Sequence, residues 1–240
     1  MVAQMIVRIH FEPSVTSELL ESIHQFLTSQ NITEPDASWE WSQAISESLP
    51  RTSFPIGPPT NGPASLSVGF LSDKKNHNRK LLSKIETPMF LAGANGVPTS
   101  MESVAIPFEG KRFNAKWLRK LAERAQELGW PIRLLHGDHG LVAHEIMKLA
   151  SWFHLDAVRE AMKQWLTDDL EQAFQQFILD YPETEIKADI GKLRDTLVDE
   201  DPQNTLIMGC LTPGFHLLHH GINYSALLSR TGVSAYLLSD

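Results

Sequence analysis

The sequence predicts an α/β protein built from two tandem copies of one unit. Residues 6–12, Ile-Val-Arg-Ile-His-Phe-Glu, are echoed by residues 103–109, Ser-Val-Ala-Ile-Pro-Phe-Glu. Both runs contain the β-branched and aromatic residues that favour strands, and both close on Phe-Glu. Two diverged copies explain this echo better than chance, so we expect a first domain at residues 1–98 and a second at residues 99–240.

A second echo lies further along each half. Residues 66–71, Leu-Ser-Val-Gly-Phe-Leu, precede a run at 83–91 that ends in Met-Phe-Leu. Residues 206–211, Leu-Ile-Met-Gly-Cys-Leu, precede a run at 229–237 that ends in Ala-Tyr-Leu. The order in each half is strand, glycine, helix and strand. Such alternation predicts parallel strands joined by right-handed crossovers.

Composition excludes several classes of function. The 240 residues carry a net charge of −8, and an acidic chain is poorly suited to non-specific nucleic-acid binding, which needs basic surface. The single cysteine, Cys210, excludes an intrachain disulfide and a cysteine-rich zinc site. No apolar run approaches the roughly 20 residues that span a bilayer. The N-terminus does not have the pattern of a secretory signal, so we expect a cytoplasmic protein with no membrane partner.

The first half predicts a strand, a helix and then a long irregular stretch. The predicted strands lie at residues 5–11, 65–71 and 88–92, and the predicted helices at residues 15–29 and 78–85. Residues 31–64 have no clear period, and their prolines favour an extended, loop-like path. Within this stretch, Trp39 and Trp41 could alternate in a short strand. Residues 93–98, Gly-Ala-Asn-Gly-Val-Pro, are interpreted as the linker.

The second half is longer and more regular. The predicted strands lie at residues 104–108, 131–136, 185–190, 205–210 and 233–238. A helix is expected at 114–128, ended by Gly129, and a short one at 192–198. Between them a helical region is expected at 141–179, broken near 154–156, where Asp156 could cap a new helix.

The C-terminal part of that helical region carries a wide apolar stripe. Its members are Val158, Met162, Trp165, Leu166, Leu170, Phe174, Phe177 and Ile178. We expect this stripe to cover the sheet, with Asp168, Asp169 and Glu171 on the solvated face. The functional alternative is the wall of a ligand pocket or a surface for a partner.

Three short motifs of the second half, in this order, resemble the universal stress protein family. Residues 106–109, Ile-Pro-Phe-Glu, are similar to the Val-Pro-x-Asp turn that ends the family's first strand. Residues 134–136, Leu-Leu-His, are similar to its second strand, and residues 206–209, Leu-Ile-Met-Gly, to its fourth. The match covers roughly residues 101–240. The first half resembles an eroded copy whose middle has been replaced.

The resemblance implies a specific architecture. Each unit would be a five-stranded, doubly wound parallel sheet, Rossmann-like and similar to the adenine-nucleotide alpha hydrolases. In this family the final strands pair across a dimer interface. Residues 88–92 are therefore expected to meet residues 233–238, so that the two units form an internal pseudo-dimer and protect each other's unpaired strand edges. Whether two such chains associate further as a homodimer stays open.

Ligands of open parallel sheets bind beyond the carboxyl ends of the strands, at the point where the strand order reverses. The resemblance therefore implies a site for ATP or AMP in the second unit. Its candidate residues are Pro107, Phe108, Glu109, His136, Gly209, Gly214, Gly221 and Asn223. Glycines in the loop after the fourth strand would let backbone N–H groups approach phosphates.

The glycine loop departs from the family pattern Gly-x2-Gly-x9-Gly-(Ser/Thr). Thr212 stands in place of the second glycine, Pro213 removes a backbone donor, and Ile222 replaces the hydroxyl residue. Glu109 replaces the family's aspartate. In the first unit the later glycines are missing altogether. Its loop has Lys74, Lys75 and Arg79, which could hold a phosphate or form an ordinary solvated turn.

Two groups of histidines need a separate interpretation. His216, His219 and His220 would share one helical face and could bind a transition metal, although no carboxylate completes the set. A position at the polar edge of the core is the alternative. The second group is His136, His139 and His144, close to Asp138 in sequence. No Ser or Cys nucleophile stands beside it, so a structural role is favoured.

These observations lead to three functional hypotheses. The first is a non-enzymatic stress-response or regulatory protein, with weak binding of an adenine nucleotide in the second unit. The second is an interaction or scaffold module that needs no nucleotide. The third is an enzyme that forms or cleaves an adenylate. Such enzymes usually carry a Ser-Gly-Gly-x-Asp-Ser loop or a His-x-Gly-His turn, and the sequence contains neither.

Overall fold

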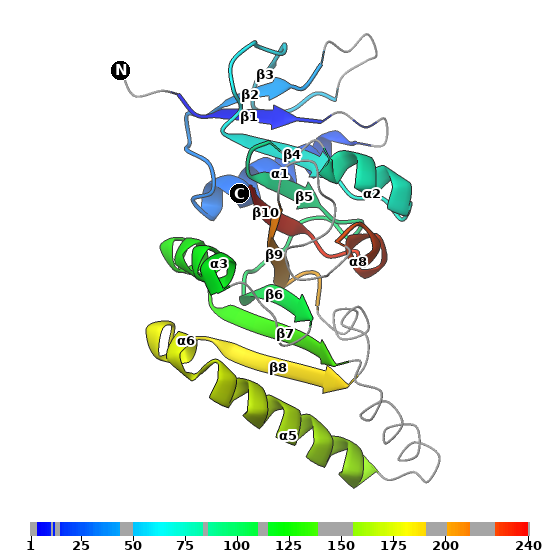
Figure 1. Ribbon diagram of the computed structural model, residues 1–240. Coiled ribbons are helices and arrows are strands. Elements are labelled where there is room, and N and C mark those ends of the chain that lie inside the picture. Colours follow the sequence, from blue (N-terminus) through cyan, green and yellow to red (C-terminus); the bar gives the residue numbers. More distant parts are fainter. Residues whose placement is uncertain are drawn as a thin grey trace.

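The computed structural model describes most of the chain. The described residues are 4–10, 12, 15–43, 50–83, 86–109, 115–138, 156–190, 201–211 and 224–239. Within them all strands belong to a single ten-stranded sheet with helices on both faces (Figure 1). Among the described helices, none combines the length and the apolar character needed to cross a membrane.

Each half supplies five strands. The first half provides β1 (Ile6–Ile9), β2 (Ser38–Trp41), β3 (Ile56–Gly57), β4 (Leu66–Phe70) and β5 (Met89–Ala92). The second half provides β6 (Ser103–Glu109), β7 (Ile132–Asp138), β8 (Glu185–Ile190), β9 (Thr205–Leu211) and β10 (Ala235–Ser239). The order across the sheet is β3-β2-β1-β4-β5-β10-β9-β6-β7-β8. Counted within its own half, each set therefore follows the order 3-2-1-4-5 of a doubly wound sheet.

The two halves join through their last strands. β5 and β10 pair antiparallel, with Phe90 opposite Tyr236, whereas the other strand pairs described are parallel. This arrangement confirms the predicted fold class, in which two doubly wound units form an internal pseudo-dimer. The pairing also leaves neither β5 nor β10 with an open edge, which is the physical reason for such a junction.

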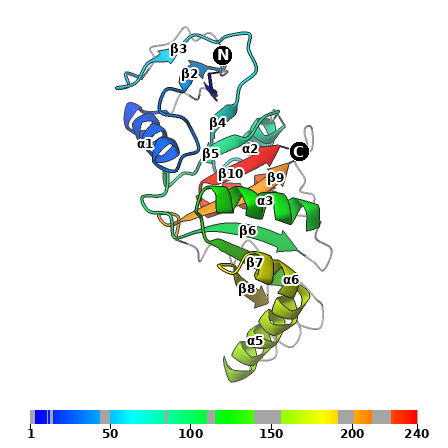
Figure 2. The ribbon, with the colours of Figure 1, turned by 90° about the vertical axis from the view of Figure 1, so that its left-hand side faces the viewer.

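Helices cover the two faces in separate layers. The described helices are α1 (Ser17–Ser29), α2 (Lys75–Leu82), α3 (Ala115–Glu127), α5 (Asp156–Ala173), α6 (Gln175–Asp180) and α8 (Tyr224–Thr231). The cluster of buried side chains that includes the apolar residues of α1, α3 and α5 occupies one face. The second cluster, with the leucines of α2 and α8, occupies the other. Figure 2 shows α3 in front of β6 and β9.

The first helix forms where its pattern and cap predict. Thr16 is its N-cap, and the hydroxyl of Thr16 accepts a hydrogen bond from the Leu19 N–H at 3.2 Å. Leu20, Ile23 and Leu27 recur at helical spacing and are completely buried against the sheet. Local capping and the apolar stripe therefore agree with the tertiary position of α1.

The irregular stretch at 31–64 contains one strand that the sequence predicted and one that it did not. Trp39 and Trp41 are buried on the same face of β2, as alternation requires. Phe54 packs edge-on against Trp39 and stacks on His24 of α1. The two-residue strand β3 follows, parallel to β2. It was missed because two residues between prolines carry no periodicity.

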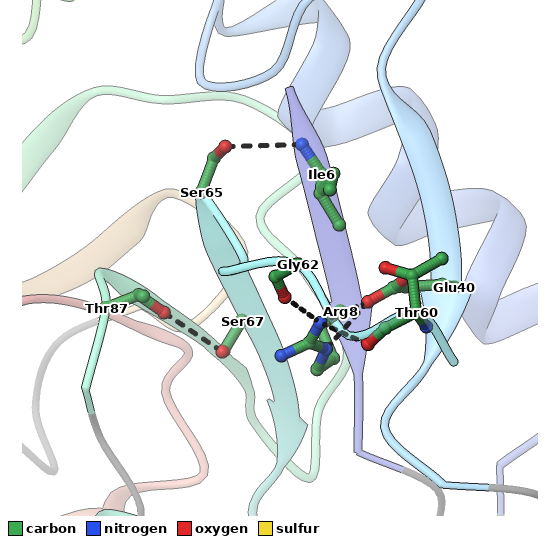
Figure 3. A network of polar contacts seen from close by, with 8 residues as sticks. All are labelled: Ile6, Arg8, Glu40, Thr60, Gly62, Ser65, Ser67 and Thr87. Carbon is green, nitrogen blue, oxygen red and sulfur yellow. Dashed lines mark hydrogen bonds and ion pairs between the residues drawn. The ribbon is translucent and has the colours of Figure 1, made fainter. Parts of the chain in front are cut away.

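A short crossover without a helix connects β3 to β4. Residues 58–65 cross β2 and β1, and a partly buried ion pair holds them in place (Figure 3). Glu40 of β2 accepts a hydrogen bond from Nε of Arg8 on β1 at 2.7 Å. Glu40 also accepts from the Thr60 N–H at 3.0 Å, and Arg8 donates to the Gly62 carbonyl at 2.7 Å. These polar contacts satisfy the crossover backbone on a sheet face that a helix would otherwise cover.

The second half follows the prediction up to β7. α3 ends close to Gly129, whose φ of +69° is the left-handed conformation that favours glycine after a helix. Asp156 is the first residue of α5, and the described helix breaks at Phe174, between α5 and α6. The predicted break at 154–155 and the predicted helix at 192–198 lie outside the described residues.

The apolar stripe on α5 was predicted only partly correctly. Leu166, Leu170 and Phe174 are buried against the sheet. Trp165, however, is 64% exposed and Val158 is 38% exposed, so the expectation that they cover the sheet was wrong. The buried residues repeat every four positions, and one residue further along a helix is rotated by about 100°. Trp165 precedes Leu166 by one residue, so it lies on a different face. Val158 precedes Leu166 by eight residues, and at 3.6 residues per turn it is rotated from Leu166 by about 80°.

Candidate functional site

The predicted site lies at the carboxyl ends of the strands in the second half. β6 has β7 on one side and β9 on the other, so the strand order reverses between β6 and β9. Glu109 is the last residue of β6 and pairs in register with Gly137 of β7. Gly209 lies in β9, opposite Leu237 of β10. The fold therefore places Glu109 and Gly209 on the two strands that border the switch point.

The ladder between β6 and β9 stops short of the strand ends. Its register runs from Ser103 opposite Thr205 to Ala105 opposite Ile207, although β6 continues to Glu109. Pro107 lies two residues after Ala105, the last paired residue, and a proline has no N–H to contribute to a ladder. Toward β7, in contrast, β6 stays paired up to Glu109. The two strands bordering the switch point are thus not paired at their carboxyl ends, where a ligand of this fold class binds.

In the first half the ladder between the corresponding strands runs one residue further along the echo. β1 and β4 pair from Val7 opposite Leu66 to Ile9 opposite Val68, where β1 ends. The His10 N–H then donates to the Val68 carbonyl at 2.8 Å and extends the contact by one more residue. The two halves therefore differ at the position where their sequences echo each other.

His136 lies in an aromatic layer beneath α5. Its side chain is 5% exposed, and its ring stacks on Phe108 with 4.7 Å between centroids. Phe174, between α5 and α6, packs against Phe108 at 5.3 Å. Nδ1 of His136 lies 3.3 Å from the Phe108 carbonyl, a contact that fits a protonated Nδ1 donating to that oxygen. The structure thus brings His136 and Phe108 together within the core, and a role for either toward a ligand stays a prediction.

Several predicted site residues lie outside the part of the chain that the structure describes. Those outside the described residues are Gly214, Gly221 and Asn223, the histidines 139, 144, 216, 219 and 220, and the loop residues Thr212, Pro213 and Ile222. Their roles stay predictions. Within the described part of the chain, no group of three His, Cys, Asp or Glu side chains is arranged to hold a metal ion.

In the first half, the loop after β4 closes on itself. Asn78 of α2 is completely buried, and its Oδ1 accepts a hydrogen bond from the Ser72 N–H at 2.9 Å. Its Nδ2 donates to the Ser72 carbonyl at 2.8 Å. The Lys74 N–H is satisfied by the Ser72 hydroxyl at 3.1 Å. Two backbone donors that could serve a phosphate are therefore already used within the protein, which favours the ordinary-turn interpretation of this loop.

Replacing buried Asn78 with alanine is expected to destabilise the first half by about 2 kcal/mol, because it leaves both backbone groups of the partly buried Ser72 without this partner. Urea unfolding of the full chain measures this change. Asn76→Ala provides the control, since Asn76 is exposed on the same helix. Equal midpoints for the two variants would show that Asn78 does not hold this loop.

The glutamate of the first echo contacts the same helix. Nε2 of His77 lies 3.4 Å from Oε1 of Glu12 and 3.2 Å from the Phe70 carbonyl. Glu12 corresponds in sequence to Glu109, so the echo was the signal that could have found this contact. The sequence did not point to His77 or Asn78, because the turn shows no local pattern beyond its basic and polar residues.

Comparison with known proteins gives structural neighbours only. No protein-family model and no curated protein matches the sequence. A universal stress protein from Archaeoglobus fulgidus DSM 4304 matches with a TM-score of 0.53 and 10% identity, over 98% of each chain. A putative universal stress protein from Pseudomonas aeruginosa UCBPP-PA14 matches with a TM-score of 0.53 and 12% identity, over 99% of this chain and 94% of its own.

A functionally unknown protein from Pseudomonas aeruginosa PAO1 is also similar, with a TM-score of 0.53 and 12% identity over 99% of this chain and 93% of its own. Coverage of nearly the whole length includes both halves and the junction between them. Identities of 10–12% carry the fold alone. The sequence resemblance is thereby confirmed at the level of architecture: the chain has the tandem α/β fold of the universal stress proteins.

Proposed function

We propose that this protein is a non-enzymatic, cytoplasmic regulatory protein of the universal stress type, whose second half binds an adenine nucleotide weakly. The observation that carries the proposal is the different pairing at the two switch points. In the second half β6 and β9 are not paired beyond Ala105, whereas in the first half β1 and β4 stay paired to the end of β1. The separation of β6 and β9 beyond Ala105 supports a nucleotide site at the strand ends of the second half.

Two further features support a nucleotide site in the second half only. The loop of the first half uses its own backbone donors, through Asn78 and Ser72. In the second half, Glu109 ends β6 next to the unpaired strand ends. A carboxylate there would accept hydrogen bonds from the ribose hydroxyls or the exocyclic amine of adenosine. We assign one nucleotide per chain on this basis.

Isothermal titration calorimetry of the full chain with ATP, ADP and AMP at millimolar concentration tests the proposal. We expect binding of at least one nucleotide at one site per chain. Glu109→Gln is expected to weaken it by roughly tenfold, the loss of one charge-assisted hydrogen bond. Glu12→Gln is the matched control, because Glu12 occupies the same place in the first echo, and it should leave binding unchanged.

Absence of heat with all three nucleotides would overturn the nucleotide assignment. The protein would then be a scaffold or interaction module, a function that the exposed Trp165 on α5 favours. Equal weakening by the two glutamine variants would contradict an asymmetric site. The non-enzymatic part has its own assay. Release of phosphate from ATP, or exchange of pyrophosphate into ATP, at a rate above the buffer blank would contradict it.

A further inference from the structure

Helix α5 has a second apolar surface, on the side away from the sheet. Its residues are Ala157, Val158, Ala161, Met162 and Trp165, which together line an open hollow of about 550 Å³. We call these five residues the α5 patch. Trp165 is 64% exposed, and it is one of three exposed large apolar side chains among the described residues. An exposed cluster of large apolar side chains commonly marks an interaction site.

The α5 patch is not part of the buried stripe of the same helix. The stripe contains Leu166, Leu170 and Phe174, which are all at most 6% exposed. Ala157, Ala161 and Trp165 repeat every four residues and form a parallel row, rotated away from the stripe. The N-terminal half of α5 is therefore apolar on two sides, although a helix that only covers a sheet needs one apolar side.

The exposed charged side chains described on α5 are acidic. Glu160, Asp168 and Glu171 are exposed and lie on the outward side of the helix. Lys163, in contrast, is partly buried at the spacing of Leu166 and Leu170, which directs it toward the sheet. The whole chain carries a net charge of −8. A partner with basic residues beside its apolar contact would therefore be attracted to this surface, and an acidic one repelled.

We propose that the α5 patch docks an amphipathic helical segment of another protein, with an apolar face and basic flanks. The small side chains of Ala157 and Ala161 leave room for a helix to approach α5 closely. Met162 can adjust its rotamers to an irregular surface, and Trp165 supplies a large rigid contact at the end of the row. Helices bind in this way when apolar residues recur every three or four positions. The proposal stands apart from the nucleotide site.

The probe for the test is a fluorescein-labelled peptide of leucine and lysine only, patterned as an amphipathic helix of about four turns. Fluorescence anisotropy measures its binding to the full chain. We expect Trp165→Gln to weaken binding at least tenfold. Leu179→Gln is the matched control, because Leu179 is 69% exposed on α6 but is not part of the patch. It should bind the peptide as the unchanged protein does.

Charge supplies a second arm of the test. Asp168→Lys should weaken binding severalfold, and raising the salt concentration should do the same for the unchanged protein. A peptide with glutamate in place of lysine should bind far more weakly. Equal binding of the two peptides, or equal loss in the Trp165 and Leu179 variants, would overturn the proposal. Sedimentation analysis identifies the competing occupant: a dimer that Trp165→Gln dissociates would mean that the patch receives a second copy instead.

Discussion

Deleting residues 233–240 is expected to abolish the cooperative fold of the whole chain. β10 occupies the middle of the sheet, between β5 of the first half and β9 of the second. The deletion removes five buried apolar side chains, which are Val233, Ala235, Tyr236, Leu237 and Leu238. A buried residue such as Val or Leu contributes about 1.5–3 kcal/mol, whereas a whole domain is stable by only about 5–15 kcal/mol. The deletion would also expose two strand edges, so we expect aggregation during expression.

Circular dichroism melts and size-exclusion chromatography measure this outcome, and a point substitution tests the same junction more mildly. A Cβ added at Gly93 would lie 2.2 Å from the Gly232 carbonyl oxygen. Two backbone segments would have to separate, so Gly93→Ala should lower the melting temperature by several degrees. Gly57→Ala is the control at the sheet edge, where the nearest atom is 3.7 Å away. A deletion variant that is soluble and melts like the full chain would contradict the proposed importance of the junction.

Removing the carboxylate of Glu40 is expected to have the second-largest effect. Its side chain is 3% exposed and pairs with Arg8, which is 23% exposed. Glu40→Ala would leave the guanidinium partly buried without its partner and would free the Thr60 N–H, at a cost of about 3 kcal/mol. Glu185→Ala is a matched control, because Glu185 pairs with Arg133 across neighbouring parallel strands at 2.7 Å but is 61% exposed. That change should cost less than about 1 kcal/mol.

Urea unfolding at pH 7 compares the two variants, and equal losses would contradict a special role of the buried pair. The pH dependence gives an independent check. Burial raises the pKa of Glu40, but hydrogen bonds from Thr60 and Arg8 outweigh it and hold the pKa below its ordinary value of 4.5. A carboxyl with a lowered pKa contributes stability above that ordinary value. This contribution is lost as the pH falls through the lowered pKa, so Glu40→Gln should flatten the acid side of the stability profile.

Local pattern was sufficient to predict most of the sheet. Strands such as β4 and β9 are short apolar runs bounded by polar residues. Helix α1 has an N-cap and helical periodicity, and α3 has helical periodicity and ends close to Gly129. The strand β3 and its crossover escaped prediction, since their order depends on the distant pair of Arg8 and Glu40 rather than on neighbours in sequence. Similarly, the apolar pattern of α5 could not show that Trp165 points away from the sheet.

The candidate site, too, could be predicted from the sequence only in part. The sequence named Glu109, His136 and Gly209 as residues at strand ends, and the fold places all three in strands of the second half. The sequence did not show that His136 is buried against Phe108, or that the ladder beyond Ala105 is open. These are properties of neighbouring strands and of the helix above them.

By itself, then, the sequence determined the duplication, the alternation of strands and helices, and the acidic character of the chain. These features depend on side chains close to one another along the chain, where periodicity and capping operate. Only the tertiary structure decided that β5 meets β10, that the two switch points differ, and that Trp165 faces outward. Each of these depends on which surfaces remain once distant segments have paired, and the free energy of that pairing comes from burial and hydrogen bonds between segments that are far apart in sequence.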